Sequence, residues 1–284
     1  MPDPSKDLVF FPGCSLASSA RENYASLQQA FWKLGFRFRE LDDWNCCGSA
    51  ATGVAGEEID FLLSARNLTK VPPGKTLLVA CPKCWTKLHI VQRRLKEDPE
   101  FASRVSRLFG TIPEEGVRIV HYLEVLTEIG VDNLARIVSA DRENLRCALY
   151  FGCTRAQQSK VNGAIMFDEQ SIQSILENLG VTGVKWPHVH RCCGTYLTGA
   201  IPEIVEELAC RIVNGAAEAG AEAIITVCAM CHFNLETRGQ KFTVLPILHF
   251  TEILSIALGI RPPGWWFRRH LVSPVNLLKK KGWL

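Results

Sequence analysis

Ten of the twelve cysteines in this 284-residue chain form one spacing pattern that occurs twice. Each copy has a single cysteine, a Cys-Cys-Gly triplet and a Cys-x-x-Cys pair, with gaps of 31 and 33 residues in the first copy and 38 and 34 in the second. The first set is Cys14, Cys46, Cys47, Cys81 and Cys84, and the second is Cys153, Cys192, Cys193, Cys228 and Cys231. Two such matches indicate a tandem duplication, so the chain is expected to fold as two related halves.

The segments around the cysteines repeat as well. Residues 8–11 and 148–151 are short apolar runs typical of strands, and each leads to a Gly-Cys dipeptide. Buried-strand patterns at residues 76–80 and 223–227 lead directly into the Cys-x-x-Cys pairs. Helical spacing is found at residues 24–34, 57–68, 167–179 and 201–217. Strands that alternate with helices predict an α/β fold with two small, mostly parallel sheets flanked by helices, in a pseudo-twofold arrangement.

The predicted domain boundary lies in the polar stretch at residues 139–144. It divides the chain into a first cysteine-rich domain, residues 1–140, and a second, residues 141–284, which ends in a basic and aromatic tail. Residues 120–126 and 248–254 resemble each other, and we expect each to form the closing helix of its half. The polar insertion at residues 96–116 is predicted to be a surface excursion.

Composition excludes several other classes of protein. Hydrophobic residues make up 47% of the chain and charged residues 21%, as in a compact protein with an ample core. The formal net charge of +3 is too small to indicate nucleic-acid binding. The apolar stretch at residues 244–260 contains polar residues and is too short to span a membrane, so we expect a buried amphipathic helix.

The N-terminal residues 1–7 lack the basic start and apolar core of a signal peptide, which predicts a cytoplasmic location. Thiols stay reduced in the cytoplasm, so a large cysteine set there favours metal binding or redox catalysis over structural disulfides.

The number of sulfurs in each set favours an iron-sulfur centre. A zinc site takes four ligands, usually as two separated short-spaced pairs, and an ordinary cubane cluster also takes four. Adjacent cysteines rarely present both sulfurs to one small ion, whereas a cluster offers several irons. Gly48 and Gly194 agree with a bulky cluster, because a residue without Cβ lets the backbone approach it. Zinc binding and reversible dithiol chemistry remain the alternatives.

The doubled pattern of Cys-Cys-Gly and Cys-x-x-Cys resembles the cysteine-rich CCG domain found in the B subunit of heterodisulfide reductase, over nearly the whole chain. In that family's methanogen enzyme, two such domains each hold a noncubane [4Fe-4S] cluster through five cysteines, and the disulfide of coenzyme M and coenzyme B is split between them. The resemblance implies that all ten repeat cysteines are cluster ligands, and that two clusters supply or accept one electron each. Other relatives take part in hydroxy-acid, fumarate or succinate and sulfur oxidation systems.

The resemblance also implies partners. The chain has neither the glycine-rich fingerprint of a nucleotide or flavin site nor a compact ferredoxin cysteine run. Electrons would therefore come from a ferredoxin-like subunit of the C type with cubane [4Fe-4S] clusters, linked to a flavoprotein subunit of the A type. These partners would also provide any association with a membrane.

The remaining candidates have weaker signals. Cys147 and Cys210 have no counterpart in the other repeat and are interpreted as small buried hydrophobes. His121 and His249 match between the repeats; they are candidates for proton transfer, or they bond near a helix start. Four residues beside the second set of cysteines are candidates for anion binding or cluster tuning, or are solvated side chains: His188, His190, Arg191 and His232. Lys83 lies inside the first Cys-x-x-Cys pair, where its positive charge would favour thiolates and raise a cluster's reduction potential.

The tail at residues 261–284 mixes tryptophan with basic residues, which favours docking to a partner subunit over packing on its own domain. The chain is thus predicted to be a catalytic component of a heterodisulfide reductase-type complex, similar to its B subunit, that reduces a disulfide or oxidises thiols or sulfane sulfur. One alternative is an electron-transfer subunit linked to a quinone or a hydroxy acid, without disulfide chemistry. The other is a zinc-stabilised interaction module.

Overall fold

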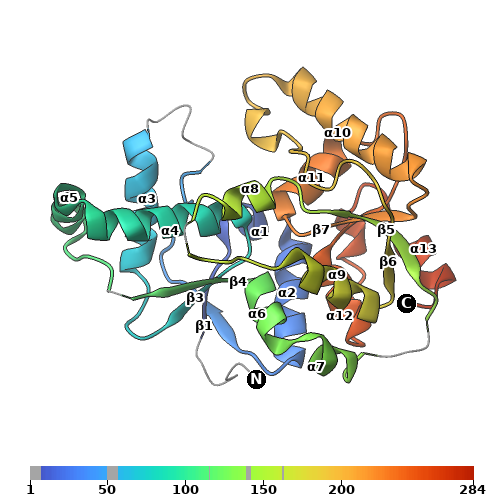
Figure 1. The fold of residues 1–284 in the computed structure, drawn as a ribbon, viewed down its shortest axis with the longest axis horizontal. Coiled ribbons are helices and arrows are strands. Elements are labelled where there is room, and N and C mark those ends of the chain that lie inside the picture. Colours follow the sequence, from blue (N-terminus) through green and yellow to red (C-terminus); the bar gives the residue numbers. More distant parts are fainter. Residues whose placement is uncertain (1–7, 50–56, 115, 139–141, 162) are drawn as a thin grey trace. The chain divides into compact units, whose positions relative to one another are not determined.

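A computed structural model of the chain describes residues 8–49, 57–114, 116–138, 142–161 and 163–284 (Figure 1). The described residues form two four-stranded parallel sheets with equivalent strand orders, β2-β1-β3-β4 and β6-β5-β7-β8. The first sheet contains β1 (Leu8–Phe11), β2 (Phe38–Glu40), β3 (Thr76–Val79) and β4 (Arg118–His121). The second contains β5 (Leu145–Tyr150), β6 (Val181–Gly183), β7 (Ala223–Thr226) and β8 (Ile247–His249). The predicted fold class is therefore confirmed.

Helices follow the strands in both halves of the chain. They are α1 (Gly13–Ala17), α2 (Arg21–Lys33), α3 (Glu57–Thr69), α4 (Pro82–Glu97), α5 (Pro99–Phe109), α6 (Tyr122–Ile129), α7 (Val131–Ala135), α8 (Thr154–Gln158), α9 (Glu169–Asn178), α10 (Pro202–Glu218), α11 (Ala229–Arg238), α12 (Phe250–Ala257) and α13 (Val275–Lys280), with short 3-10 helices η1 (Thr195–Leu197) and η2 (Phe267–Arg269). Asp98 and Asp168 cap α5 and α9 by accepting a backbone N–H, and α4, α5 and α10 each begin at a proline, which suits the first helical turn.

The central strands are largely buried, as expected of parallel sheets whose two faces are covered by helices. Every residue of β1 and β7 is buried. The register pairs Phe11 of β1 with Val79 of β3, and Tyr150 of β5 with Thr226 of β7. The two central strands of each sheet therefore end level with each other, and their following loops start from the same edge.

The chain forms two compact units that interleave along the sequence. Unit 1 comprises Met1–Cys14, Gly35–Glu128 and Ala156–Phe167, and unit 2 comprises Ser15–Leu34, Ile129–Arg155 and Asp168–Leu284. Helix α2 thus belongs to unit 2, where Ser26 Oγ lies 2.6 Å from Thr251 Oγ1 of α12. The predicted boundary between residues 140 and 141, like the N-terminal residues 1–7, lies outside the described residues.

Three local predictions were wrong in detail. Residues 120–126 and 248–254 each begin in a strand, β4 or β8, and only then enter α6 or α12. The stretch at residues 244–260 is accordingly a strand followed by a helix. Residues 96–116 contain α5, which buries Phe101 and Val105, so this insertion belongs partly to the core.

Part of the C-terminal tail packs into unit 2. Trp266, Phe267, Leu278 and Trp283 are buried, whereas Trp265 and Leu271 are exposed. The indole N–H of Trp283 donates to the backbone oxygen of Glu143 at 2.9 Å. Among the described residues, no helix has the length and apolar character needed to cross a membrane.

Candidate functional site

The ten repeat cysteines lie after corresponding strands of the two sheets. In unit 1, Cys14 follows β1 and lies in α1, whereas Cys81 follows β3 and caps α4. In unit 2, Cys153 follows β5 and Cys228 follows β7, where it caps α11. The Cys-Cys pairs lie in the loops after β2 and β6. Since the carboxyl ends of parallel strands share one edge, each unit gathers its five sulfurs at that edge.

The five sulfurs of unit 1 form a connected group. Cys84 Sγ lies 3.1 Å from Cys47 Sγ, and Cys84 also hydrogen-bonds to Cys81. Cys46 interacts with both Cys14 and Cys47. Hydrogen bonds with Cys14 and then Cys47 lower the pKa of Cys46, whereas the bond with Cys46 raises the pKa of Cys47 to about 12.

The second group repeats this arrangement. Cys193 Sγ lies 3.4 Å from Cys231 Sγ, and Cys231 also hydrogen-bonds to Cys228. Cys153 hydrogen-bonds to Cys192 and is electrostatically coupled to Cys228 and Cys193. The bond with Cys231 lowers the pKa of Cys193, and the bond with Cys193 raises the pKa of Cys231. Within the described part of the chain, which holds all twelve cysteines, no disulfide is present.

These opposite shifts have one physical cause. Closely spaced sulfurs share their protons, because a second thiolate beside the first is repelled by its charge. Five thiolates can therefore coexist at either site only when a cation offsets their charge, and a bound metal deprotonates a coordinating thiol outright. A metal centre bound to either group would supply such positive charge.

Burial gives each site an inner and an outer side. Cys14 is exposed and Cys46 is half-buried, whereas the other three cysteines of unit 1 are buried. In unit 2, Cys153 and Cys192 are half-buried and the remaining three are buried. The Cys-x-x-Cys pairs thus form the inner side, at the N-termini of α4 and α11, where the helix dipole favours negative charge.

The glycines of the two triplets have left-handed backbones, with φ of +84° at Gly48 and +74° at Gly194. A Cβ on Gly48 would lie 2.8 Å from the Asp60 backbone, and one on Gly194 would lie 3.0 Å from Leu208. Their backbone N–H groups donate to the sulfurs of the first cysteine in each pair, and the distance from Gly194 N to Cys192 Sγ is 3.4 Å. The missing Cβ makes room for a helix, and the approach of the backbone to a cluster stays a prediction.

The matched histidines lie just before α6 and α12. His121 Nε2 donates to the backbone oxygen of Ala80 at 3.1 Å, and burial lowers the pKa of His121 to about 3. His249 caps α12, where its Nδ1 lies 2.7 Å from Thr251 Oγ1. Both therefore have structural hydrogen bonds near a helix start, and their role in proton transfer stays a prediction.

The remaining candidates differ in their surroundings. Cys147 is buried in β5, where burial raises its pKa, and Cys210 on α10 donates to the backbone oxygen of Arg238 at 3.2 Å. His190 is exposed and lies 3.2 Å from Glu169, whereas Lys83 and His188 are half-buried.

The interpretation of His232 as a solvated side chain is wrong. His232 is buried, and its two ring nitrogens contact Asn23 and the backbone oxygen of Ile247. The Arg191 side chain is exposed, while its backbone oxygen accepts the Tyr150 hydroxyl at 2.6 Å.

Sequence reasoning missed two tyrosines beside the second sulfur group. Burial first, and then the nearby sulfurs, raise the pKa of Tyr150. Tyr196 is 49% exposed and hydrogen-bonds to Cys192, whose charge raises its pKa. The position of Tyr196, two residues after the Cys-Cys-Gly triplet, was the available signal.

The chain matches the cysteine-rich CCG domain family twice, over residues 8–89 and 147–236. It is 25% identical over 281 residues to the 8-methylmenaquinol:fumarate reductase membrane anchor subunit of Wolinella succinogenes, covering 96% of this chain and 99% of that protein. It is 24% identical over 300 residues to the B subunit of the ferredoxin/F420H2-dependent CoB-CoM heterodisulfide reductase of Methanosarcina acetivorans, covering 96% of both.

Among solved structures, the crystal structure of a hypothetical protein from Helicobacter pylori has a TM-score of 0.71 and 12% sequence identity. The match covers 95% of this chain but 53% of that one, so this chain spans about half the length of that protein. At this identity the likeness concerns the fold alone.

Proposed function

Because the chain belongs to the cysteine-rich CCG domain family, we propose that it is an iron-sulfur subunit of an oxidoreductase complex that acts on a thiol or disulfide. Each five-cysteine group would hold one [4Fe-4S] cluster of the noncubane type. The ligands would be Cys14, Cys46, Cys47, Cys81 and Cys84 in unit 1, and Cys153, Cys192, Cys193, Cys228 and Cys231 in unit 2. The observation that carries the proposal is the gathering of five sulfurs at the same sheet edge in both units.

The donor set fits such a group. Soft thiolate ligands select iron-sulfur clusters or zinc, and five sulfurs exceed the four that a tetrahedral zinc ion takes. The N–H groups of Gly48 and Gly194 point at sulfur, as is common for hydrogen bonds that tune clusters. When bound, the clusters supply one-electron transfers and iron with affinity for sulfur.

In each site, the buried cysteines and the more exposed cysteines lie on different sides. The buried Cys-x-x-Cys pair anchors the inner side and keeps it from water. The outer side, formed by Cys14 and Cys46 in unit 1 and by Cys153 and Cys192 in unit 2, is accessible to a small thiol. Tyr196, which contacts Cys192 and is half exposed, would orient a substrate beside the second site.

Two observations favour sulfur chemistry over simple electron transfer. Both sets of five cysteines are complete, as expected of a site that needs two one-electron centres for a two-electron disulfide bond. Relatives covered over 96% of their length include the B subunits of two CoB-CoM heterodisulfide reductases. The proposed partners are a ferredoxin-like subunit of the C type and a flavoprotein of the A type, and the proposed location is the cytoplasm.

A second candidate function is electron transfer in a quinone-linked complex without disulfide chemistry. It is favoured by the Wolinella relative, which is covered over 99% of its length and is named as a subunit of a methylmenaquinol:fumarate reductase. In this case the complex would be associated with the membrane through its partners. A zinc-stabilised interaction module is the third candidate, since zinc also binds thiolates.

Anaerobic purification followed by iron, zinc and acid-labile sulfide analysis tests the cofactor. We expect about eight irons per chain, four per cluster. Zinc without iron would overturn the proposal. Electron paramagnetic resonance of the partly oxidised protein then tests the substrate, using the CoB-CoM heterodisulfide and dihydrolipoamide as probes. A changed signal supports thiol or disulfide chemistry, and an iron-loaded protein that responds to neither probe favours quinone-linked electron transfer.

A further inference from the structure

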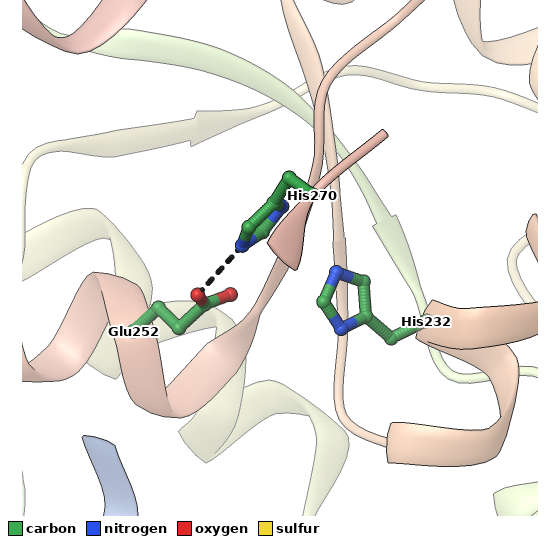
Figure 2. A group of neighbouring side chains, drawn as sticks. All are labelled: His232, Glu252 and His270. Carbon is green, nitrogen blue, oxygen red and sulfur yellow. Dashed lines mark hydrogen bonds and ion pairs between the residues drawn. The ribbon is translucent and has the colours of Figure 1, made fainter. Parts of the chain in front are cut away.

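Three metal-binding side chains converge in unit 2, outside the ten cysteines. His232 of α11, Glu252 of α12 and His270, directly after η2, are all buried. Each offers one ligand atom, and these atoms lie within 4.8 Å of one another. Figure 2 shows the Glu252 carboxylate directed at the His270 ring, with the His232 ring beside them. We propose that this trio, the His-Glu-His cluster, binds a divalent transition-metal ion such as Zn²⁺.

The surroundings of His270 are those of a metal-binding imidazole. Its Nε2 lies 2.9 Å from Glu252 Oε1, and its Nδ1 lies 3.1 Å from Glu236 Oε1. A carboxylate behind the ring is a common outer partner of metal-bound histidine, because it fixes the tautomer and strengthens the ligand. Glu236 would serve as this outer partner, and Glu252 would share the ion with Nε2.

Hydrogen bonds also fix the orientation of the His232 and Glu252 side chains. His232 lies 3.1 Å from the backbone oxygen of Ile247 through Nε2 and 3.0 Å from the Asn23 amide through Nδ1. Binding an ion replaces one of these two bonds, and the other keeps the ring in place. One oxygen of Glu252 accepts the backbone N–H of His249 at 2.8 Å, and the other, which now contacts His270 Nε2 at 2.9 Å, would bind the ion in place of that contact.

The charges around the cluster match a divalent cation. Three buried carboxylates, Glu22, Glu236 and Glu252, face one fixed cation, Arg269, whose Nε lies 2.6 Å from Glu22. With neutral imidazoles these groups carry a net charge of −2, and buried charge is costly unless it is compensated. One divalent ion supplies that compensation. Protons on both imidazoles balance the same charge, and this metal-free form is the alternative that the experiment tests.

The required movement is small. Bonds of about 2.0–2.2 Å to nitrogen and oxygen place the ligand atoms of a tetrahedral zinc site about 3.3–3.6 Å apart. Atoms now up to 4.8 Å apart would thus close by about 1.2–1.5 Å. The borderline donor set of two imidazoles and a carboxylate suits zinc and its neighbours in the first transition row. The ion would join α11, α12 and the C-terminal segment after η2 into one structural site.

The experiment uses the anaerobically purified, iron-loaded chain, incubated with Zn²⁺ and desalted. Zinc K-edge X-ray absorption then reports the ligands directly, because Zn–S bonds are about 2.3 Å and Zn–N or Zn–O bonds about 2.0–2.2 Å. We expect one zinc per chain with only nitrogen and oxygen neighbours. The absence of bound zinc, or zinc with sulfur neighbours, would overturn the proposal. Iron content is measured in the same sample, so loss of the clusters and loss of this site are distinguishable.

Substitutions assign the ion to these residues. His270→Gln removes one ligand with little change in volume and is expected to weaken zinc retention at least tenfold. The matched control is Arg269→Gln, which breaks the neighbouring ion pair but keeps all three ligands and should retain zinc. If His270→Gln does not fold, as judged by circular dichroism and iron content, Glu252→Gln replaces it. Zinc binding equal to the wild type in a folded ligand variant would refute the assignment.

Discussion

Helices α4 and α11 each contain the second cysteine of a Cys-x-x-Cys pair, but their buried faces differ in chemistry. In α4 the residue after the second cysteine is Trp85, which is fully buried, with its ring centroid 4.3 Å from that of His89. In α11 the same positions are His232 and Glu236, which belong to the buried charged network described above. Two copies of a sulfur group can therefore keep the same cysteines while the helix of one copy rests on aromatic packing and that of the other on charged side chains.

A second difference lies where a helix packs on each Cys-Cys-Gly turn. In unit 1 the residue that packs on this turn is Asp60, which is fully buried and whose carboxylate lies 3.8 Å from Lys87 Nζ. In unit 2, Val205 packs near Gly194, and Asn234, at the position equivalent to Lys87, donates to the backbone oxygen of Cys193 at 2.9 Å. At the Cys-Cys-Gly turn, therefore, the buried charge is in unit 1, whereas unit 2 has an apolar side chain and an amide. The buried charges of the two units are thus carried by residues at different positions of the repeat.

The largest predicted effect tests whether the two sulfur groups are independent. Cys193→Ala should remove about half of the bound iron, because one [4Fe-4S] site is lost, and Cys47→Ala should do the same for unit 1. Iron and sulfide analysis gives the stoichiometry. Cys147→Ala, which removes a buried thiol outside both groups, is the control and should keep all the iron. Full iron content in Cys193→Ala would contradict the ligand assignment.

The aromatic support of unit 1 is the next effect in size. Trp85→Ala opens a cavity in the core and should lower the free energy of unfolding by about 3–5 kcal/mol. Urea unfolding followed by circular dichroism measures this change. Trp265→Ala, at an exposed tryptophan of the C-terminal segment, should cost less than about 1 kcal/mol. Equal losses in the two variants would contradict the role of the buried Trp85 in supporting the interior of unit 1.

The charged pair of unit 1 can be tested by breaking and then neutralising it. Lys87→Met leaves the buried Asp60 carboxylate without its cation and should cost about 3 kcal/mol of unfolding free energy. Adding Asp60→Asn removes the uncompensated charge and should restore most of that loss. Thermal unfolding of the single and double variants measures both steps. A neutral Lys87→Met would show that the pair does not support the turn at Gly48.

The smallest predicted effect concerns the amide that replaces this pair in unit 2. Asn234→Ala removes the hydrogen bond to the Cys193 backbone and should cost about 1–2 kcal/mol. The control is Thr237→Ala on the same helix, whose hydroxyl bonds at the exposed surface and whose loss should change stability by less than about 0.5 kcal/mol. An Asn234→Ala loss as large as that of Lys87→Met would contradict the ranking of the two supports.

The central strands and the position of the cysteines were predictable from the sequence for a local reason. Continuous apolar runs such as those of β1 and β7 have few alternatives to a buried parallel strand. Cysteines that directly follow such strands must meet at one edge. The edge strands β2 and β6 were missed because each has three residues, of which two are exposed. Strands β4 and β8 were missed because they continue directly into helices.

The His-Glu-His cluster had no comparable signal. His232, Glu252 and His270 are far apart in the chain, and the residues at the positions of His232 and Glu236 in the first repeat are Trp85 and His89, so the repeat gave no warning. The C-terminal tail was equally ambiguous, because tryptophan suits both a core and a docking surface. Burial of Trp266 and Trp283 shows that part of it belongs to the core of unit 2.

The amino-acid order alone determined the duplication, the parallel strands and the grouping of five sulfurs per repeat, because these depend on spacing and on periodicity within short segments. Only the tertiary structure decided that α2 joins unit 2, that Trp266 and Trp283 are buried and that two histidines meet a glutamate. Those outcomes depend on contacts between segments far apart in the chain, where many pairings have similar local preferences and the packing of side chains selects one.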